Sequence, residues 1–377
     1  MIQYIFDSPN VSNLSKFLTR GANLEETIDR YRGKSILTKD LTLADNCKYY
    51  YPITHSMPYS LEFIDVDTFK HIPILNLIVQ GKVHLLLDQS AEEFCPDVIY
   101  LHKMAEEAGI PSNHIHYASC LDDAAEKYEY DGQRGLINWQ YRDHHIEYMS
   151  AVAKCITPKD PAPTEYLYAA LNAGKHNFGK VEMVYQLWAN GLIDQGQVSL
   201  NKDDAYGRIG DKSDMDSRDQ QFLNILPLTP KHWTGSNLFL TTPSQLSSKW
   251  PTWSQQFYDQ EHQEISGCKF YISSETSQYG RDCYFTEKTV RALLHRRPFL
   301  INGMSGGLAK LQRLGFKTFS NYWSEDYDTI ETQDQIQFAI QLLKDNPDLT
   351  GIEEITEYNF QHLKNTDWFG IFEDGLK

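Results

Sequence analysis

The sequence predicts an α/β protein made of two domains, and three observations support this expectation. The chain has 377 residues, which is enough for two domains of ordinary size. Short apolar runs typical of strands alternate with helical stretches, a pattern that favours parallel sheets. The segment Thr157–Thr164 contains three prolines and is typical of an extended linker. We therefore expect one α/β domain over residues 1–160 and a second over residues 161–377.

The elements expected in the first domain follow from its apolar runs. Gln3–Phe6 and Lys82–Leu87 have the composition of strands. Val98–Ala108 predicts a helix that ends at Gly109, and His114–Ala118 predicts the next strand. This order of elements is that of repeated strand–helix–strand units.

The same alternation resumes after the prolines and predicts a second parallel sheet. Ligands of open α/β sheets bind at the carboxyl ends of the strands, so two such domains facing each other would suit an enzyme with two substrates. The expected strands are Tyr166–Leu171, Leu238–Leu240, Phe270–Ser273 and Pro298–Ile301, and the expected helices are Phe178–Trp188, one from Glu287, and Gly307–Leu314.

The composition of the chain argues against several classes of protein. The formal net charge of −16 argues against a general affinity for nucleic acids, which depends on lysine and arginine. No apolar run approaches the length of a membrane span, and the first residues lack the features of a secretory signal. The six cysteines form no Cys-x-x-Cys pair, as expected for reduced thiols. We expect a folded protein of the cytoplasm.

The start of one predicted helix is a candidate anion site. Thr286 can cap this helix, and Glu287 and Lys288 occupy its first turn. Free backbone N–H groups and the lysine charge favour a phosphate, and a glutamate can accept hydrogen bonds from a ribose diol. This combination is suited to a nucleoside diphosphate. The alternative is an ordinary ion pair on the surface of a helix.

A second candidate lies in the loop Asn172–Asn177 before the helix Phe178–Trp188. Lys175, His176 and Lys180 stand where a loop at the end of a strand presents basic groups to an anion. A solvated basic turn is the alternative. Two basic segments at separate strand ends of one domain favour the functional interpretation.

These segments contain motifs of a known family. Glu275–Ser277 is similar to a Phe-Glu-Asn-Ser element, Asp282–Lys288 to Asp-Tyr-(Val/Ile)-Thr-Glu-Lys, and Asn172–Phe178 to a Ser-Asn…Arg-x-x-Phe loop. Together they resemble the donor-binding half of the α1,3-fucosyltransferases. Phe285–Phe319 also resembles phage and bacterial glycosyltransferase-like proteins. The similarity extends from about Thr164 to Asp328.

The resemblance implies a GT-B fold, in which two Rossmann-like domains face each other across a cleft. It implies an inverting glycosyltransferase that takes a nucleoside-diphosphate sugar, with GDP-sugars favoured, and needs neither a metal nor another cofactor. Carried over by position, Glu287 would contact the ribose, and Lys175 and Lys288 the phosphates. Tyr284 and Thr276 would line the same nucleotide region.

An inverting transfer also needs a base that takes the proton of the acceptor hydroxyl. The candidates lie after the expected strand Lys82–Leu87 and are Asp88, Glu92 and Glu93. His84 is a weaker candidate, because a histidine inside an apolar strand more often belongs to the core.

Two other functions remain open besides transfer to a glycan. The first is transfer to a hydroxymethylated base of phage-type DNA, with Lys82, Arg134 and Arg142 at the rim of a basic cleft. The second is a binding module on a degenerate transferase fold. Asp65–Asp67 and Asp214–Asp216 match the Asp-x-Asp motif of metal-dependent transferases, but such tripeptides are frequent in an acidic chain, and we expect no metal site.

Overall fold

The computed structural model of the chain divides into two compact units. The first comprises Met1–Glu147, Ser244–Ser248 and Asp367–Lys377, and the second comprises Tyr148–Pro243 and Lys249–Thr366. The structure describes residues 1–6, 31–32, 34–54, 65–90, 95–127, 129–130, 133–134, 137–160, 162–172, 178–200, 243, 245–275, 283–303 and 305–377.

These units differ from the expected domains of residues 1–160 and 161–377 in three respects. The division falls after Glu147, within a helix, and the segments Ser244–Ser248 and Asp367–Lys377 both belong to the first unit. This return of the chain depends on long-range packing, which the local pattern of the sequence does not report.

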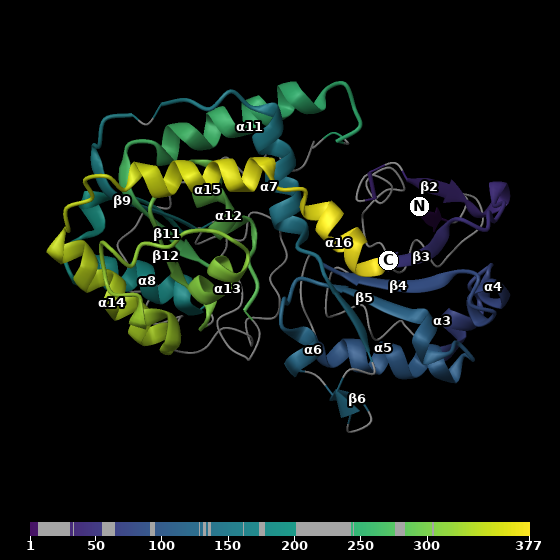
Figure 1. The fold of residues 1–377 in the computed structure, drawn as a ribbon. Coiled ribbons are helices and arrows are strands. Elements are labelled where there is room, and N and C mark those ends of the chain that lie inside the picture. Colours follow the sequence, from purple (N-terminus) through teal and green to yellow (C-terminus); the bar gives the residue numbers. More distant parts are fainter. Residues whose placement is uncertain are drawn as a thin grey trace. The chain divides into compact units, whose positions relative to one another are not determined.

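The first unit is built on a sheet of parallel strands in the order β2-β1-β3-β4-β5-β8 (Figure 1). A separate antiparallel pair, β6 and β7, stands outside this sheet. The strands are β1 (Ile2–Phe6), β2 (Ser35–Leu37), β3 (Lys48–Thr54), β4 (His84–Gln89), β5 (Ile115–Ser119), β6 (Glu129–Tyr130), β7 (Gln133–Arg134) and β8 (Asn138–Tyr141).

Helices cover both faces of this sheet. On one face they are α3 (Val66–Lys70), α4 (Leu75–Val79) and α5 (Cys95–Glu107), and on the other the C-terminal α16 (Trp368–Leu376). The unit also contains α6 (Ala124–Lys127), the start of α7 (His144–Cys155), which continues into the second unit, and 3₁₀ turns at Thr38–Asp40 and Ser112–His114.

Strand β4 shows why both faces must be covered. Its three leucines alternate: Leu85 and Leu87 pack in a cluster with residues of α3, α4 and α5. Leu86 points to the opposite face and packs in a cluster with Phe369 and Phe372 of α16. An apolar run of this kind is typical of a central parallel strand. Asp88 continues the alternation on the face of Leu86.

The second unit is built on a smaller parallel sheet with the strand order β10-β9-β11-β12. Its strands are β9 (Tyr166–Asn172), β10 (Gly196–Leu200), β11 (Cys268–Ser274) and β12 (Phe299–Asn302). Leu200 pairs with Asn172, and Ser274 pairs with Asn302. The carboxyl ends of all four strands therefore lie along one edge.

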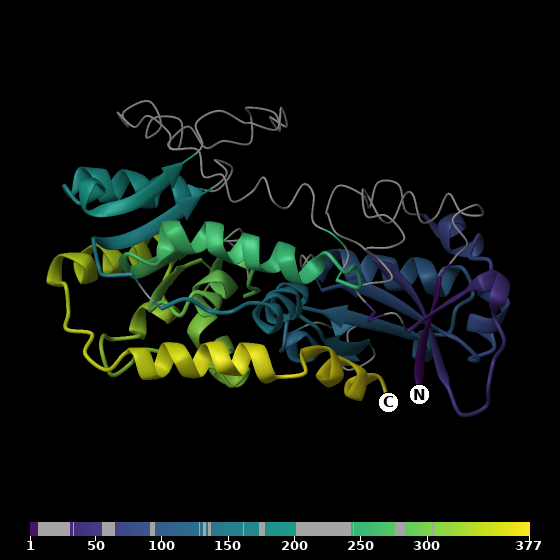
Figure 2. The ribbon, with the colours of Figure 1, turned by 90° about the horizontal axis from the view of Figure 1, so that it is seen from above.

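Helices of this unit pack in two groups. Helix α14 packs against α8, and α12 packs against α15. Figure 2 shows α8 beside the strands β9 and β10 that it connects. The helices are α8 (Phe178–Ala189), α11 (Trp250–Ile265), α12 (Glu287–Leu294), α13 (Gly307–Arg313), α14 (Thr332–Asp345) and α15 (Glu353–Asn365), with 3₁₀ turns at Ile193–Gln195 and Asp326–Thr329.

The structure confirms the α/β class with parallel sheets. The helix expected to end at Gly109 is α5, and Gly109 has the positive φ of 91° that favours glycine at such a point. The expected strand Leu238–Leu240 lies outside the described residues. The facing of two domains across a cleft, as in the GT-B fold, stays a prediction.

Candidate functional site

The carboxyl edge of the second sheet contains the point where the chain connections reverse direction. From β9 the chain passes through α8 to β10 on one side, and from β11 it passes through α12 to β12 on the other. Open α/β sheets bind ligands outside the strand ends at such a point. The strands end here in the buried polar residues Asn172, Ser274 and Asn302. This edge therefore has the position and the polar residues of a ligand site.

The first turn of α12 is held by a buried carboxylate from the end of β11. Glu275, which is 3% exposed, accepts hydrogen bonds from the hydroxyl of Thr286 at 2.5 Å and from that of Thr289 at 2.6 Å. It also accepts from the backbone N–H groups of both residues at 3.2 Å. The Thr286 side chain in turn caps the helix by accepting from the N–H of Lys288 at 3.4 Å.

This geometry corrects one expectation. The sequence predicts free backbone N–H groups at the start of α12, but Glu275 and Thr286 occupy those of Thr286, Lys288 and Thr289. An anion at this edge would therefore be bound chiefly by side chains. Glu275 is the residue that the family resemblance aligns with the glutamate of Phe-Glu-Asn-Ser.

Lys288 and Glu287 form an ion pair at the beginning of α12. The ammonium group of Lys288 lies 2.9 Å from Oε1 of Glu287 and donates to the hydroxyl of Thr286 at 3.0 Å. Burial works against the lysine charge, but the carboxylates of Glu287 and Glu275 outweigh it, so the pKa of Lys288 is raised above its usual value. Lys288 is thus a permanent cation.

Lys180 is a second lysine at the same edge. It lies in the first turn of α8 and is only 7% exposed. Burial, followed by the repulsion of Lys288, lowers the pKa of Lys180 to about 7 despite the opposing effect of Glu287 and Glu275. Among the described residues, no hydrogen-bond or ion-pair partner contacts its ammonium group. Strongly shifted lysines of this kind are frequent at functional sites.

Asn302, at the end of β12, connects the strand ends to α8. Its amide Nδ2 donates to the carbonyl of Gly179 at 3.2 Å and lies 3.5 Å from the hydroxyl of Ser274. Its Oδ1 is buried and has no hydrogen-bond partner in the described part of the chain. We refer to Lys180, Glu275, Glu287, Lys288 and Asn302 as the switch-point site.

The other donor-site residues expected from the sequence have different outcomes. Lys175 and Thr276 lie outside the described residues. Tyr284 stands just before α12 and is buried, at 8% exposure. From the sequence, Lys180 is expected only as one of the basic groups near the loop that precedes α8. Its position within the mainly apolar helical run Phe178–Val184 could have indicated a buried cation. Sequence reasoning missed Asn302, whose position depends on sheet pairing.

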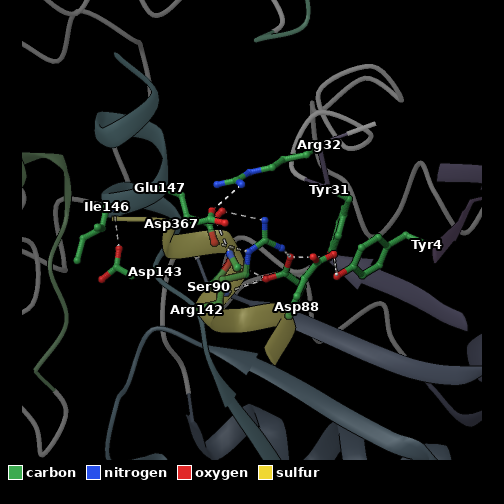
Figure 3. Close-up of polar contacts among 12 residues, drawn as sticks. Tyr4, Tyr31, Arg32, Asp88, Ser90, Arg142, Asp143, Ile146, Glu147 and Asp367 are labelled. Atoms are coloured by element: carbon green, nitrogen blue, oxygen red, sulfur yellow. Dashed lines mark hydrogen bonds and ion pairs between the residues drawn. The ribbon is translucent and has the colours of Figure 1, made fainter. Parts of the chain in front are cut away.

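The first unit has a buried charge cluster at the ends of β4 and β8 (Figure 3). The guanidinium of Arg142 donates to Oδ2 of Asp88 at 2.8 Å and to both carboxylate oxygens of Glu147 at 3.0 and 3.1 Å. It also lies 5.2 Å from the ring centre of Phe369 and 5.0 Å from that of Phe372. Arg142 thus fastens α16 to the sheet as well as pairing two carboxylates.

Electrostatics hold the arginine of this cluster in its charged form. Burial opposes the charge of Arg142, but the carboxylates of Glu147 and Asp88 hold the pKa of the guanidinium well above its usual value. Burial raises the pKa of Glu147, although Arg142 opposes this rise. The cluster has the form of a buried ion-pair network.

The hydrogen bonds that Asp88 accepts oppose its use as a general base. Oδ1 accepts from the backbone N–H and the hydroxyl of Ser90, and Oδ2 accepts from the hydroxyl of Tyr31 and from Arg142. A carboxylate offers about four lone-pair positions, so none is left for an acceptor hydroxyl. This geometry favours a structural role, and a catalytic role for Asp88 stays a prediction. Glu92 and Glu93 lie outside the described residues.

The remaining candidates of the first unit lie at different ends of the main sheet or outside it. His84 begins β4, at the end of the strand opposite to Asp88, and its Nδ1 lies 3.2 Å from Nε2 of His116. Arg142 is 1% exposed, which corrects the expectation that it rims a basic cleft for DNA. Lys82 is exposed, and Arg134 belongs to β7.

Within the described residues, no group of histidine, cysteine and acidic side chains could hold a metal ion. The two aspartates of Asp65–Asp67 have local roles. Asp65 caps α3 by accepting from the N–H of Thr68 at 2.8 Å, and Asp67 pairs with Lys70 at 2.9 Å. Asp214–Asp216 lies outside the described residues. Over the part of the chain that the structure covers, no helix combines the length and apolarity of a membrane span.

Comparisons with known proteins add no relative. No protein-family model matches the chain, and neither the curated proteins nor the solved structures give a significant match. The fold defines an α/β protein with parallel sheets, and its second unit carries the switch-point site.

Proposed function

We propose that the chain is an inverting glycosyltransferase that moves a sugar from a nucleoside-diphosphate sugar to a hydroxyl acceptor, which is a glycan in the simplest case. The observation that carries the proposal is the gathering of two lysines and two carboxylates at the strand ends of the second unit. Charged groups at the switch point of a parallel sheet are suited to a phosphorylated ligand. The resemblance to α1,3-fucosyltransferases independently selects Lys288 and Glu287 and favours a GDP-sugar.

In the proposal, the ion pair of Glu287 and Lys288 changes partners when the donor binds. Their side chains are 32% and 13% exposed, so the pair is accessible to a ligand. The diphosphate would replace the carboxylate beside Lys288, and Glu287 would accept hydrogen bonds from the ribose hydroxyls. A charge-assisted contact replaces another of the same kind, so little desolvation is added.

The chemical step follows from the leaving group. The acceptor oxygen attacks the anomeric carbon, the bond from that carbon to the diphosphate oxygen breaks, and the configuration inverts. Lysine charges at the switch-point site stabilise the departing diphosphate. The acceptor proton passes to a carboxylate of the first unit, for which Asp88, Glu92 and Glu93 are the candidates. Lys175 as a second phosphate ligand is part of the same proposal.

Calorimetric titration with a panel of GDP- and UDP-sugars tests the donor site. We expect Lys288→Met to weaken donor binding by about 2 kcal/mol, because a charge-assisted contact is lost. The matched control is Lys344→Met, which removes an exposed lysine of α14. Wild-type protein that binds none of these nucleotide sugars would overturn the proposal, and an unchanged affinity in the Lys288 variant would overturn the assigned site.

A second candidate function is a non-catalytic module that binds nucleotide sugars. The observation that favours it is the carboxylate of Asp88, the one candidate base among the described residues, whose oxygens already accept four hydrogen bonds. Incubation with a radiolabelled donor and a mixture of glycan acceptors separates the two functions. Transfer of label by the wild type, lost in Glu92→Gln or Glu93→Gln, supports the enzyme. Donor binding without any transfer supports the module.

A DNA acceptor is the weakest of the three alternatives. The formal net charge is −16, and Arg142 is buried in an ion-pair network. Mixing the protein with duplex DNA that carries hydroxymethylated bases, at low salt, provides the test. We expect no binding there, and salt-sensitive binding would restore this alternative.

A further inference from the structure

The two lysines of the switch-point site are held in different ways. Lys288 is already paired with Glu287 and donates to Thr286. Lys180 is more deeply buried, and no described side chain or carbonyl accepts a hydrogen bond from it. A largely buried lysine without a protein partner for its ammonium group is unfavourable, and lysines of this kind are frequent at functional sites.

The backbone next to Lys180 is bonded to the end of β12. Asn302 holds the backbone of α8 by donating to the carbonyl of Gly179, the residue before Lys180. The same amide leaves Oδ1 as a buried acceptor without a partner, at a residue only 2% exposed. Lys180 follows Gly179 in the chain, and the Asn302 amide is hydrogen-bonded to Gly179. The lysine, which lacks an acceptor, and Oδ1 of Asn302, which lacks a donor, are thus both associated with the first turn of α8. A ligand with both phosphate and hydroxyl groups has the chemistry to satisfy both.

We propose that Lys180 is the deeper of the two lysines that receive the diphosphate, and that its neutral amino group takes up one proton from solvent when the diphosphate binds. The inference rests on the proposed function and extends it to a residue outside the family motif. The proton adds to the lone pair of Nζ, and no other bond forms or breaks. Asn302 is a positioning residue that holds the first turn of α8.

The charges around Lys180 explain why the proton arrives with the ligand. The charged groups that act on it are Lys288 and Glu287 of α12 and Glu275 after β11. In the free protein, burial and the charge of Lys288 lower the pKa of Lys180 to about 7. A diphosphate adds at least two negative charges beside it, which favours the ammonium form. At pH 8 about nine-tenths of the lysine is neutral before binding, so uptake approaches one proton.

The test is calorimetric titration of the full chain with GDP and with pyrophosphate at pH 8, in buffers of different ionisation enthalpy. The dependence of the heat on the buffer gives the number of protons taken up. For the wild type we expect nearly one proton, and an affinity for GDP that falls about tenfold per pH unit between pH 8 and 9. Thermal unfolding of each variant checks that it is folded.

Two variants distinguish the effect of a positive charge at position 180 from the effect of proton uptake there. Lys180→Arg keeps a permanent cation, so the proton uptake and the pH dependence should both disappear while GDP still binds. Lys180→Met should lose the uptake and bind GDP at least about tenfold more weakly at pH 7, through the loss of a charge-assisted contact. The matched control Lys344→Met should behave as the wild type.

The outcomes are distinguishable. Wild-type binding without proton uptake at pH 8, or uptake that persists in Lys180→Met, overturns the assignment of Lys180. Binding of GDP and pyrophosphate with the expected uptake, but without sugar transfer from any donor, leaves that assignment standing and overturns the transferase. A wild type that binds neither GDP nor pyrophosphate overturns both.

Discussion

Replacement of Lys180 by methionine should make the free protein more stable, because the lysine is buried without a partner. Methionine keeps an unbranched apolar side chain of similar length and removes the ammonium group. The pKa of Lys180 is about 7 in the folded chain, against an ordinary value of 10.5. Each pKa unit corresponds to about 1.4 kcal/mol, so the cost of keeping the charge at low pH has an upper limit of about 5 kcal/mol.

The stability gained by Lys180→Met should depend on pH, because the folded and unfolded chains bind protons differently at Lys180. Between pH 7 and 10.5 the unfolded chain binds more protons at this lysine than the folded chain does, so wild-type stability rises with pH. Below pH 7 both states are protonated, and the full cost remains. The advantage of Lys180→Met should therefore be largest at pH 6 and smaller by about 2 to 3 kcal/mol at pH 9.

Urea unfolding followed by circular dichroism at pH 6 and pH 9 measures the effect. Lys344→Met is the matched control, since it removes a lysine that is exposed on α14. Its stability relative to the wild type should not change with pH. A variant at position 180 that is less stable than the wild type at pH 6, or a difference that does not change with pH, would refute the reasoning.

Three further predictions concern stability. Glu275→Gln should cost about 1 to 3 kcal/mol in urea unfolding, because the charged acceptor of the α12 cap is lost, whereas Glu353→Gln on the surface of α15 should cost almost nothing. Arg142→Met should cost about 3 to 5 kcal/mol, because two buried carboxylates lose their partner, and the loss should shrink when Glu147→Gln is added. Burial lowers the pKa of His116 to about 4, so the free energy of unfolding should decline as pH falls from about 6.5 to 4, where only the unfolded chain binds a proton at this residue. His116→Phe should flatten this part of the plot of stability against pH, and an unchanged decline would contradict the prediction.

The parts of the fold that the sequence predicts are those controlled by neighbours along the chain. Thr286 is expected to cap a helix, and it accepts from the N–H of Lys288, two residues later. Strand β4 is expected from a run of leucines, which are buried on both faces of the sheet. Capping and side-chain alternation act over a few residues, so a single sequence is enough to predict them.

The parts that the sequence does not predict depend on residues far apart in the chain. Asp88 follows its strand as expected, but Arg142 and Tyr31 occupy its carboxylate. Glu275 is expected in the donor motif, yet it caps α12 through Thr289. Neither set of hydrogen-bond partners can be recognised from the residues that neighbour Asp88 or Glu275 in the sequence.

The sequence by itself determined the α/β class, the alternation of strands and helices, and the presence of acidic and basic groups after particular strands. Only the tertiary structure decided that Lys180 lies within electrostatic reach of Lys288, and that one of them is paired while the other is not. Local patterns set which residues stand at a strand end. Parallel pairing of β9 with β11, separated by a long stretch of chain, sets which ends are neighbours and therefore which charges interact.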